Sequence, residues 1–95
     1  MARGYWIVRV SVRDAARYPD YLAAARPAFE KFGARFVVRG GPFEAKEGVS
    51  RERNVVVEFA DVATAHACYD SPEYQAAKAI RNAVADADFI IVEGA

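Results

Sequence analysis

The segment from His66 to Arg81 holds most of the side chains that could perform chemistry. Its sequence, HACYDSPEYQAAKAIR, contains the only histidine and the only cysteine of the chain, with two tyrosines and an arginine. His66 is the candidate catalytic base, because an unperturbed histidine exchanges protons near neutral pH. The alternative is a packed histidine hydrogen-bonded to the backbone, since the helical spacing puts His66 on the apolar side of its helix, towards Trp6.

Cys68 could act as a nucleophile only beside a base or a positive charge that lowers its pKa. It lies two residues after His66 and so points elsewhere on a helix, which favours a structural or merely exposed thiol. A metal site needs two or three ligands, and no histidine, cysteine or carboxylate stands at a supporting spacing. The sequence also lacks a cofactor fingerprint, so we expect neither a metal nor a cofactor.

Tyr74, Lys78 and Arg81 stand at i, i+4 and i+7, along one flank of a predicted helix. An arrangement of this kind could bind an anion or an enolate. A solvated helix flank is the commoner meaning of the same spacing, and it remains the alternative.

Arg39 is the stronger candidate for anion binding. A guanidinium at the end of a strand can hold a carboxylate in a pocket or across a dimer interface. The structural alternative is an ion pair with Glu58 or Glu44. The following Gly40-Gly41 lacks the spacing of a phosphate loop and is interpreted as a backbone turn or bulge.

The polarity pattern predicts the elements that must position these residues. Apolar residues at alternate positions indicate strands, and apolar stripes at helical spacing indicate helices. Ser71 and Pro72 have the residue types of an N-cap and a first helical turn, so a helix restarts there. Pro27 should kink the first helix between Ala23 and Pro27, unless that helix is two pieces. The expected strands are 5–12, 35–39, 54–59 and 89–93, and the expected helices are 18–32, 61–69 and 72–84.

The element order β-α-β-β-α-β predicts an α+β, ferredoxin-like fold. Its four-stranded antiparallel sheet has the order 4-1-3-2, with both helical segments on one face. We expect Arg9 on the open face, between Glu58 and Glu93. That face is too apolar for solvent and too charged for a dry core, so a second sheet should cover it, which makes the chain a homodimer through the sheet face. Its other predicted members are Tyr5, Ile7, Ser11, Val37, Arg39 and Val56.

Length and composition limit the remaining possibilities. The chain has 95 residues, which suits one domain spanning 1–95. It has 13 basic and 13 acidic residues and no basic run, which argues against a nucleic-acid partner. No apolar run approaches a membrane span or a secretion signal, so no membrane partner is expected. The single cysteine excludes an internal disulfide and favours a cytoplasmic location.

Several motifs together resemble a known family. The runs GYWIVRV, FGARFVVRGGPFE, VVVEF, CYDSPEYQAAKAIR and FIIVEG are similar, in this order and spacing, to the domain-of-unknown-function family 1330. The resemblance covers nearly the whole chain and implies a dimeric α/β barrel. The family has no agreed activity, and the wider structural group includes cofactor-free monooxygenases, lactone isomerases and ligand binders.

Two hypotheses follow from these observations. In the first, the protein is a small homodimeric α/β barrel of unknown activity that binds a small molecule. In the alternative, it is a cofactor-free, monooxygenase-like or isomerase-like enzyme acting on a small aromatic or lactone-like compound, with His66 as base and Arg39 as anion holder. The expected ligand-binding residues are Trp6, Arg39, His66, Tyr69, Tyr74 and Arg81.

Overall fold

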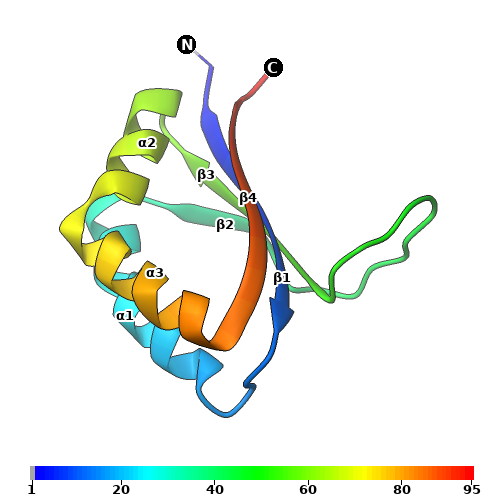
Figure 1. Cartoon of the computed structure of the whole chain (residues 1–95). Coiled ribbons are helices and arrows are strands. Elements are labelled where there is room, and N and C mark those ends of the chain that lie inside the picture. The colour runs from blue at the N-terminus through cyan, green and yellow to red at the C-terminus, as the bar shows by residue number, and fades with distance from the viewer. Residues whose placement is uncertain (1) are drawn as a thin grey trace.

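The computed structural model describes residues 2–95, which form one antiparallel sheet with helices on a single face (Figure 1). The sheet order is β2-β3-β1-β4, so the predicted ferredoxin-like arrangement and strand order are confirmed. The elements are β1 (Gly4–Val12), α1 (Tyr18–Phe32), β2 (Arg35–Arg39), β3 (Arg53–Phe59), α2 (Val62–Asp70), α3 (Pro72–Val84) and β4 (Ala85–Glu93).

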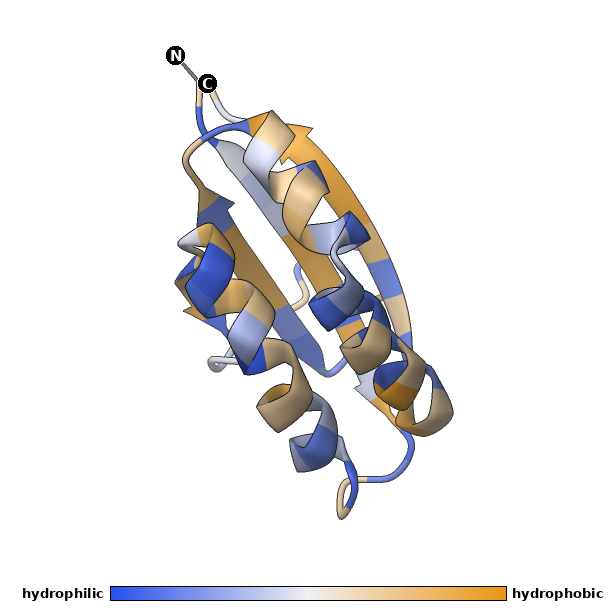
Figure 2. Cartoon of the chain, turned by 90° about the vertical axis from the view of Figure 1, so that its left-hand side faces the viewer, coloured by the Kyte–Doolittle hydropathy of each residue, from blue (hydrophilic) through white to orange (hydrophobic). Residues whose placement is uncertain are grey.

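Trp6, on the central strand β1, lies at the middle of the core. Its side chain is 1% exposed, and its indole Nε1 donates a hydrogen bond to the carbonyl of Ala65 in α2 at 3.0 Å. Its ring centroid lies 5.0 Å from that of Phe59 and 4.8 Å from those of Tyr74 and Phe89. Burial of these aromatic rings therefore attaches the sheet to α2 and α3. Figure 2 looks onto the helices, with the hydrophobic strands behind them.

The helix boundaries follow local capping signals. The Asp61 carboxylate accepts a hydrogen bond from the Thr64 amide at 2.7 Å, and hydrogen bonding from Thr64 lowers the pKa of Asp61. Ser71 Oγ accepts from the Tyr74 amide at 3.2 Å, with Pro72 opening α3, which confirms the predicted helix restart. Helix α1 is continuous through Pro27, and the expected kink stays a prediction.

Strand β4 is longer than the sequence predicted. It begins at Ala85, directly after α3, rather than at Phe89. Residues 85–88 have weak strand propensity, but they pair with the end of β1, and this tertiary pairing overrides the local preference.

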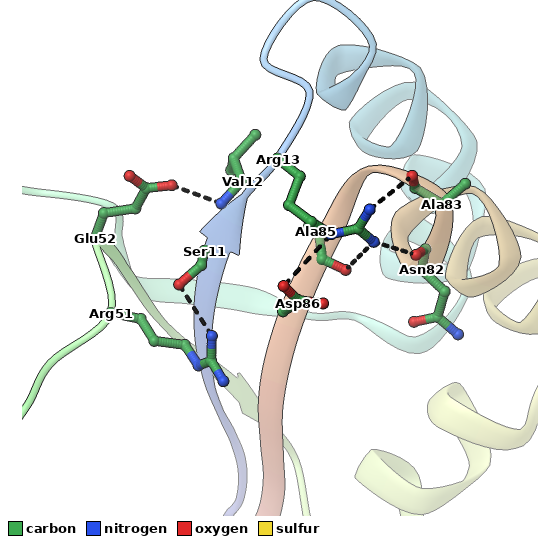
Figure 3. Close-up of polar contacts among 9 residues, drawn as sticks. All are labelled: Ser11, Val12, Arg13, Arg51, Glu52, Asn82, Ala83, Ala85 and Asp86. Carbon is green, nitrogen blue, oxygen red and sulfur yellow. Dashed lines mark hydrogen bonds and ion pairs between the residues drawn. The ribbon is translucent and has the colours of Figure 1, made fainter.

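Arg13 stabilises the junction between α3 and β4 (Figure 3). Its guanidinium donates to the carbonyls of Asn82 at 2.7 Å, Ala83 at 3.4 Å and Ala85 at 3.3 Å. It also forms an ion pair with Asp86, with Nε at 3.4 Å from the carboxylate. These bonds satisfy carbonyl groups that the end of a helix leaves without intrahelical partners.

A register shift in β2 changes the face on which its last residues lie. Phe36 pairs with Val57, whereas Val38 pairs with Val56 and Arg39 with Val55. The extra residue reverses the alternation, so Val38 belongs to the open face and Arg39 to the helix-covered face. The sequence predicted the opposite face for both residues, because strict alternation was assumed.

The expected environment of Arg9 was also wrong. Arg9 lies opposite Asn54 on β3 and Asp88 on β4, whereas Glu58 lies opposite Tyr5. The reason is the antiparallel register, which places Glu58 opposite Tyr5, four residues nearer the start of β1 than expected. The Tyr5 hydroxyl donates to Glu58 at 3.0 Å.

Residues 40–52 form a long loop that projects from the sheet on the side away from the helices (Figure 1). Its end is fastened to the sheet, because Arg51 donates to Ser11 Oγ at 3.0 Å and pairs with Asp88 at 2.8 Å. Glu52 accepts from the Val12 amide at 2.6 Å (Figure 3). The hydrogen bond from Arg51 lowers the pKa of Asp88.

Within residues 2–95, no helix has both the length and the apolar character needed to cross a membrane.

Gly4 provides a test of how closely β1 approaches α2. A Cβ atom at this position would overlap the backbone of Asp61 and Val62. We therefore expect Gly4→Ala to lower the free energy of unfolding by about 1–3 kcal/mol, as overpacking of a rigid contact does. At Gly41 a Cβ would meet nothing within 4 Å, so Gly41→Ala should change stability by less than about 0.5 kcal/mol. Urea denaturation measures both, and equal effects would contradict this packing.

Candidate functional site: an aromatic cavity with a basic end

A cavity of about 590 Å³ lies between α1 and the helix-covered face of β1, β2 and β3. Its volume is within the range of roughly 300–1,000 Å³ that is usual for small-molecule sites. Most of its wall is aromatic or aliphatic, with a few charged side chains. The lining residues are Trp6, Val8, Val10, Tyr18, Tyr21, Leu22, Arg26, Phe29, Glu30, Ala34, Phe36, Arg39, Arg53, Val55 and Val57.

One end of the cavity is formed by aromatic rings. Phe29 of α1 lies edge-on to Phe36 of β2, with ring centroids 5.0 Å apart, and 5.8 Å from the ring of Trp6. The three residues come from three different elements, which meet because α1 runs antiparallel to β1 and returns towards the start of β2. Rings in these orientations offer both faces and edges to a flat ligand.

Two arginines from adjacent strands line the cavity where β2 ends and β3 begins. Arg53 opens β3 opposite Val10, and its guanidinium carbon lies 5.7 Å from the ring centroid of Tyr18. Arg39 ends β2, with its guanidinium carbon 3.8 Å from the centroid of Phe36. Stacking on aromatic rings holds both guanidinium groups at the cavity wall.

The charges at this wall are not balanced. Among the described residues that line the cavity, Arg26, Arg39 and Arg53 are basic and Glu30 is acidic. None of the ion pairs within residues 2–95 includes any of these arginines. Arg53 Nε is buried and has no hydrogen-bond partner within that range. A buried donor without a partner is unfavourable, so this end of the cavity favours an anion.

Gly40 creates the space that Arg53 occupies. Its φ of 65° lies in the left-handed region, and a Cβ at this position would overlap the Arg53 guanidinium. The prediction that the Gly40-Gly41 pair is a backbone device is thus consistent with its geometry. It contributes to the site by admitting an arginine side chain.

Three polar side chains form a buried polar group behind the cavity, between α1 and α3. Tyr74 is 0% exposed, its hydroxyl lies 2.8 Å from that of Tyr21, and Arg81 Nη1 donates to it at 2.7 Å. Burial is the main reason that the pKa of Tyr74 is raised well above its usual value. The alternative of a solvated flank is therefore wrong for Tyr74 and Arg81, because α3 packs this side against α1.

His66 does not lie where the sequence placed it. Ala65 and Cys68 occupy the buried side of α2, and His66 is exposed. Together with Tyr69, His66 lines a separate, more open hollow of about 340 Å³ between α2 and β4. Ala65 and Tyr69 of the expected apolar side do pack on the core, but Cys68 is buried beside them in place of His66, so the expectation of a packed histidine was wrong.

The structure therefore distributes the predicted ligand-binding residues over three places. Trp6 and Arg39 line the aromatic cavity, and His66 and Tyr69 line the hollow beside β4. Tyr74 and Arg81 form the buried polar group and are part of neither wall.

Sequence reasoning missed Arg53 and Tyr21. Arg53 had a usable signal, because it continues the alternation of Val55 and Val57 towards the helices. Tyr21 was expected on the apolar stripe of α1, but nothing in the sequence indicated that its hydroxyl would meet another tyrosine.

Within residues 2–95, no cluster of three or more histidine, cysteine or carboxylate side chains is placed to hold a metal ion.

Cys68 is buried in the core, where its thiol lies 3.8 Å from the carbonyl of Ala28. Burial, with a smaller contribution from Glu73, raises its pKa to about 12. The thiol is therefore protonated at neutral pH and is a poor nucleophile.

We expect iodoacetamide to leave the folded protein unmodified at pH 8 and to add one carbamidomethyl group after unfolding in urea. Because Cys68 is the only cysteine of the chain, intact mass spectrometry reads its modification directly. Prompt labelling of the folded protein would contradict both the burial and the raised pKa.

Comparison with known proteins supports the fold and identifies the family. The chain has a TM-score of 0.80 and 20% identity to the crystal structure of a protein of unknown function from Rhodopseudomonas palustris, covering 99% of this chain and 83% of that one. SnoaB, a cofactor-independent oxygenase from Streptomyces nogalater, matches with a TM-score of 0.66 and 14% identity, over 97% of this chain and 92% of its own.

A dimeric ferredoxin-like protein of unknown function from Thermobifida fusca matches with a TM-score of 0.56 and 18% identity, over 97% of this chain and 91% of its own. No curated protein matches at a significant level. At these identities the structural likenesses show the fold. The family model described as "Domain of unknown function (DUF1330)" matches residues 3–95, and the chain belongs to this family.

Proposed function

We propose that the protein binds a small, flat, apolar molecule that carries a carboxylate or a similar anionic group, in the cavity under α1. The observation that carries this proposal is the charge of the wall, where three arginines face one glutamate at an otherwise apolar cavity. The ring system of the ligand packs against Trp6 and Phe29, and its anionic group lies at Arg39 and Arg53.

The two ends of the cavity contribute differently to binding. Burial of aromatic surface supplies affinity without much selectivity, at roughly 25 cal/mol per Å² of apolar area removed from water. The guanidinium groups supply selectivity, because a charge-assisted hydrogen bond contributes about 1.5–3 kcal/mol. A neutral ligand of the same shape leaves the buried Nε of Arg53 without a partner.

Binding of 1-naphthoate, followed by isothermal titration calorimetry, tests the proposal. Arg53→Met and Arg39→Met should each weaken binding by about tenfold, because each removes a charged donor while keeping a side chain of similar length. Arg35→Met is the matched control, since Arg35 is exposed and pairs with Glu58 on the open face. If the control weakens binding as much as the other two variants do, or if none of the three does, the ligand is not held by this wall.

The open face of the sheet supports a second proposal, a homodimer formed sheet to sheet. Its exposed apolar side chains include Ile90, which is 55% exposed, and Val38, which is 41% exposed. They are joined across the strands by Ile7 and Val56, since Ile7 pairs with both Val56 and Ile90. A continuous apolar patch of this kind is typical of an interface. The ferredoxin-like protein from Thermobifida fusca is dimeric and has the same fold, which is consistent with this arrangement.

Ile90→Lys should convert the dimer into a monomer, because it places a charge in the apolar centre of the proposed interface. Its effect on the core should be small, since Ile90 faces away from the helices. Ala79→Lys, at an exposed position on α3, is the control and should remain dimeric. Size-exclusion chromatography with light scattering measures both masses. A wild-type monomer, or an Ile90→Lys variant that remains dimeric, would contradict the proposed interface.

The alternative is a cofactor-free reaction on the bound compound. It is supported by the shared fold with a cofactor-independent oxygenase and by the largely apolar wall of the cavity. Native mass spectrometry of protein purified under mild conditions identifies any retained ligand. A product formed when that compound is incubated with the protein in air supports catalysis, whereas its unchanged recovery supports binding alone. His66→Ala tests the candidate base: because His66 lines the hollow beside β4 and not this cavity, turnover of a compound bound in the cavity should survive the substitution.

A further inference from the structure

A chain of three polar side chains connects the end of α3 to the wall of the cavity. Arg81 Nη1 donates to the Tyr74 hydroxyl at 2.7 Å, and the hydroxyls of Tyr74 and Tyr21 lie 2.8 Å apart. All three side chains are at least nine-tenths buried, and of the three only Tyr21 lines the cavity. Arg81 is a cation that forms no ion pair within residues 2–95.

The direction of the hydrogen bonds among these three side chains follows from which groups can accept. Arginine only donates, so the Tyr74 oxygen is an acceptor towards Arg81. Tyr74 carries one hydroxyl proton and is 0% exposed, and within residues 2–95 the acceptor in reach of that proton is the oxygen of Tyr21. A buried hydroxyl that donates to nothing is unfavourable, so Tyr74 donates to Tyr21.

Tyr21 is consequently left with a proton that no described residue accepts. Its oxygen already accepts from Tyr74, and Tyr21 is one of the residues that line the cavity. The guanidinium of Arg81 polarises the chain, since consecutive hydrogen bonds in a buried setting strengthen one another. Tyr21 therefore has a strengthened donor that is free to bond on the helix side of the site.

We propose that Tyr21 is a specificity-determining residue, whose hydroxyl donates a hydrogen bond to an oxygen of the ligand, with Arg81 and Tyr74 as the positioning residues that keep its proton directed into the cavity. This inference rests on the proposed function and adds a requirement to it. The ligand must present an acceptor oxygen to α1 as well as to the strands.

The position of Tyr21 places this oxygen at the basic end of the cavity. The ring centroids of Tyr21 and Tyr18 are 5.5 Å apart, and the Arg53 guanidinium lies over Tyr18. Because both residues neighbour Tyr18, we expect one carboxylate to accept from Arg53 and from Tyr21. A carboxylate or an ester or ketone carbonyl satisfies the tyrosine, and the negative charge of a carboxylate also satisfies the arginine.

The test compares two ligands of the same shape, 1-naphthoate and 1-methylnaphthalene, on wild type, Tyr21→Phe, Tyr74→Phe and the double variant. Tyr21→Phe should weaken 1-naphthoate binding by about tenfold and leave 1-methylnaphthalene unchanged, because the second ligand has no acceptor. Tyr74→Phe should weaken 1-naphthoate binding by a smaller factor. The double variant should match Tyr21→Phe, since Tyr74 acts only through Tyr21.

Each other outcome has a defined meaning. If Tyr21→Phe binds 1-naphthoate like wild type while Arg53→Met does not, the cavity proposal stands and the role of Tyr21 is overturned. If Tyr21→Phe weakens both ligands equally, the hydroxyl has a packing role and the inference is again overturned. A wild-type protein that binds neither ligand overturns the proposed function and the inference with it. Tyr74→Phe provides the same ligand comparison should Tyr21→Phe fail to fold.

Discussion

The position of Trp6 is the constraint on which the rest of the structure depends. Its indole fills the space between the central strand and the helices, and its one donor bonds to the carbonyl of Ala65. The same side chain contacts the rings that hold α2 and α3 and forms the floor of the cavity under α1. A rigid aromatic floor keeps the cavity walls at a fixed separation, so the site is built on the core of the sheet and not on a mobile loop.

The basic side chains of this site lie at one end of it. The helix-covered face is apolar at Trp6, Val57 and Phe36, and it becomes basic where β2 ends and β3 begins. The cationic groups there are stacked on rings and are not neutralised by carboxylates. An isolated cation in partly buried surroundings costs solvation energy, and an anionic ligand recovers that energy. In the proposed function, the fold therefore combines general apolar affinity with selection for one end of a ligand.

The sequence was sufficient for the architecture because the relevant signals are local. Alternation in β1 identified Trp6 as inward-facing, and Ser71-Pro72 specified the helix restart. The site was harder to predict, because it depends on backbone offsets. One extra residue in β2 places Arg39 on the helix side of the sheet, opposite to the expected side. His66 lies at the surface because Cys68 takes the buried position on α2. A nine-residue helix with a weak apolar pattern does not define its buried side clearly.

The buried polar chain shows a further limit of sequence reasoning. Tyr74 and Arg81 were recognised as a pair on one helix flank, but their burial depends on α1, which supplies Tyr21 from 53 residues away. No local rule relates these positions. The positions of their protons follow from burial and from the number of donors and acceptors, both of which depend on how the helices pack together.

A crystal structure of the protein with 1-naphthoate tests the central claim most directly. We expect the ring system to lie against Trp6 and Phe29, with the carboxylate within hydrogen-bond distance of Arg53 and of the Tyr21 hydroxyl. Electron density for the ligand in the hollow at His66, or on the open face of the sheet, with the cavity under α1 unoccupied, would contradict it.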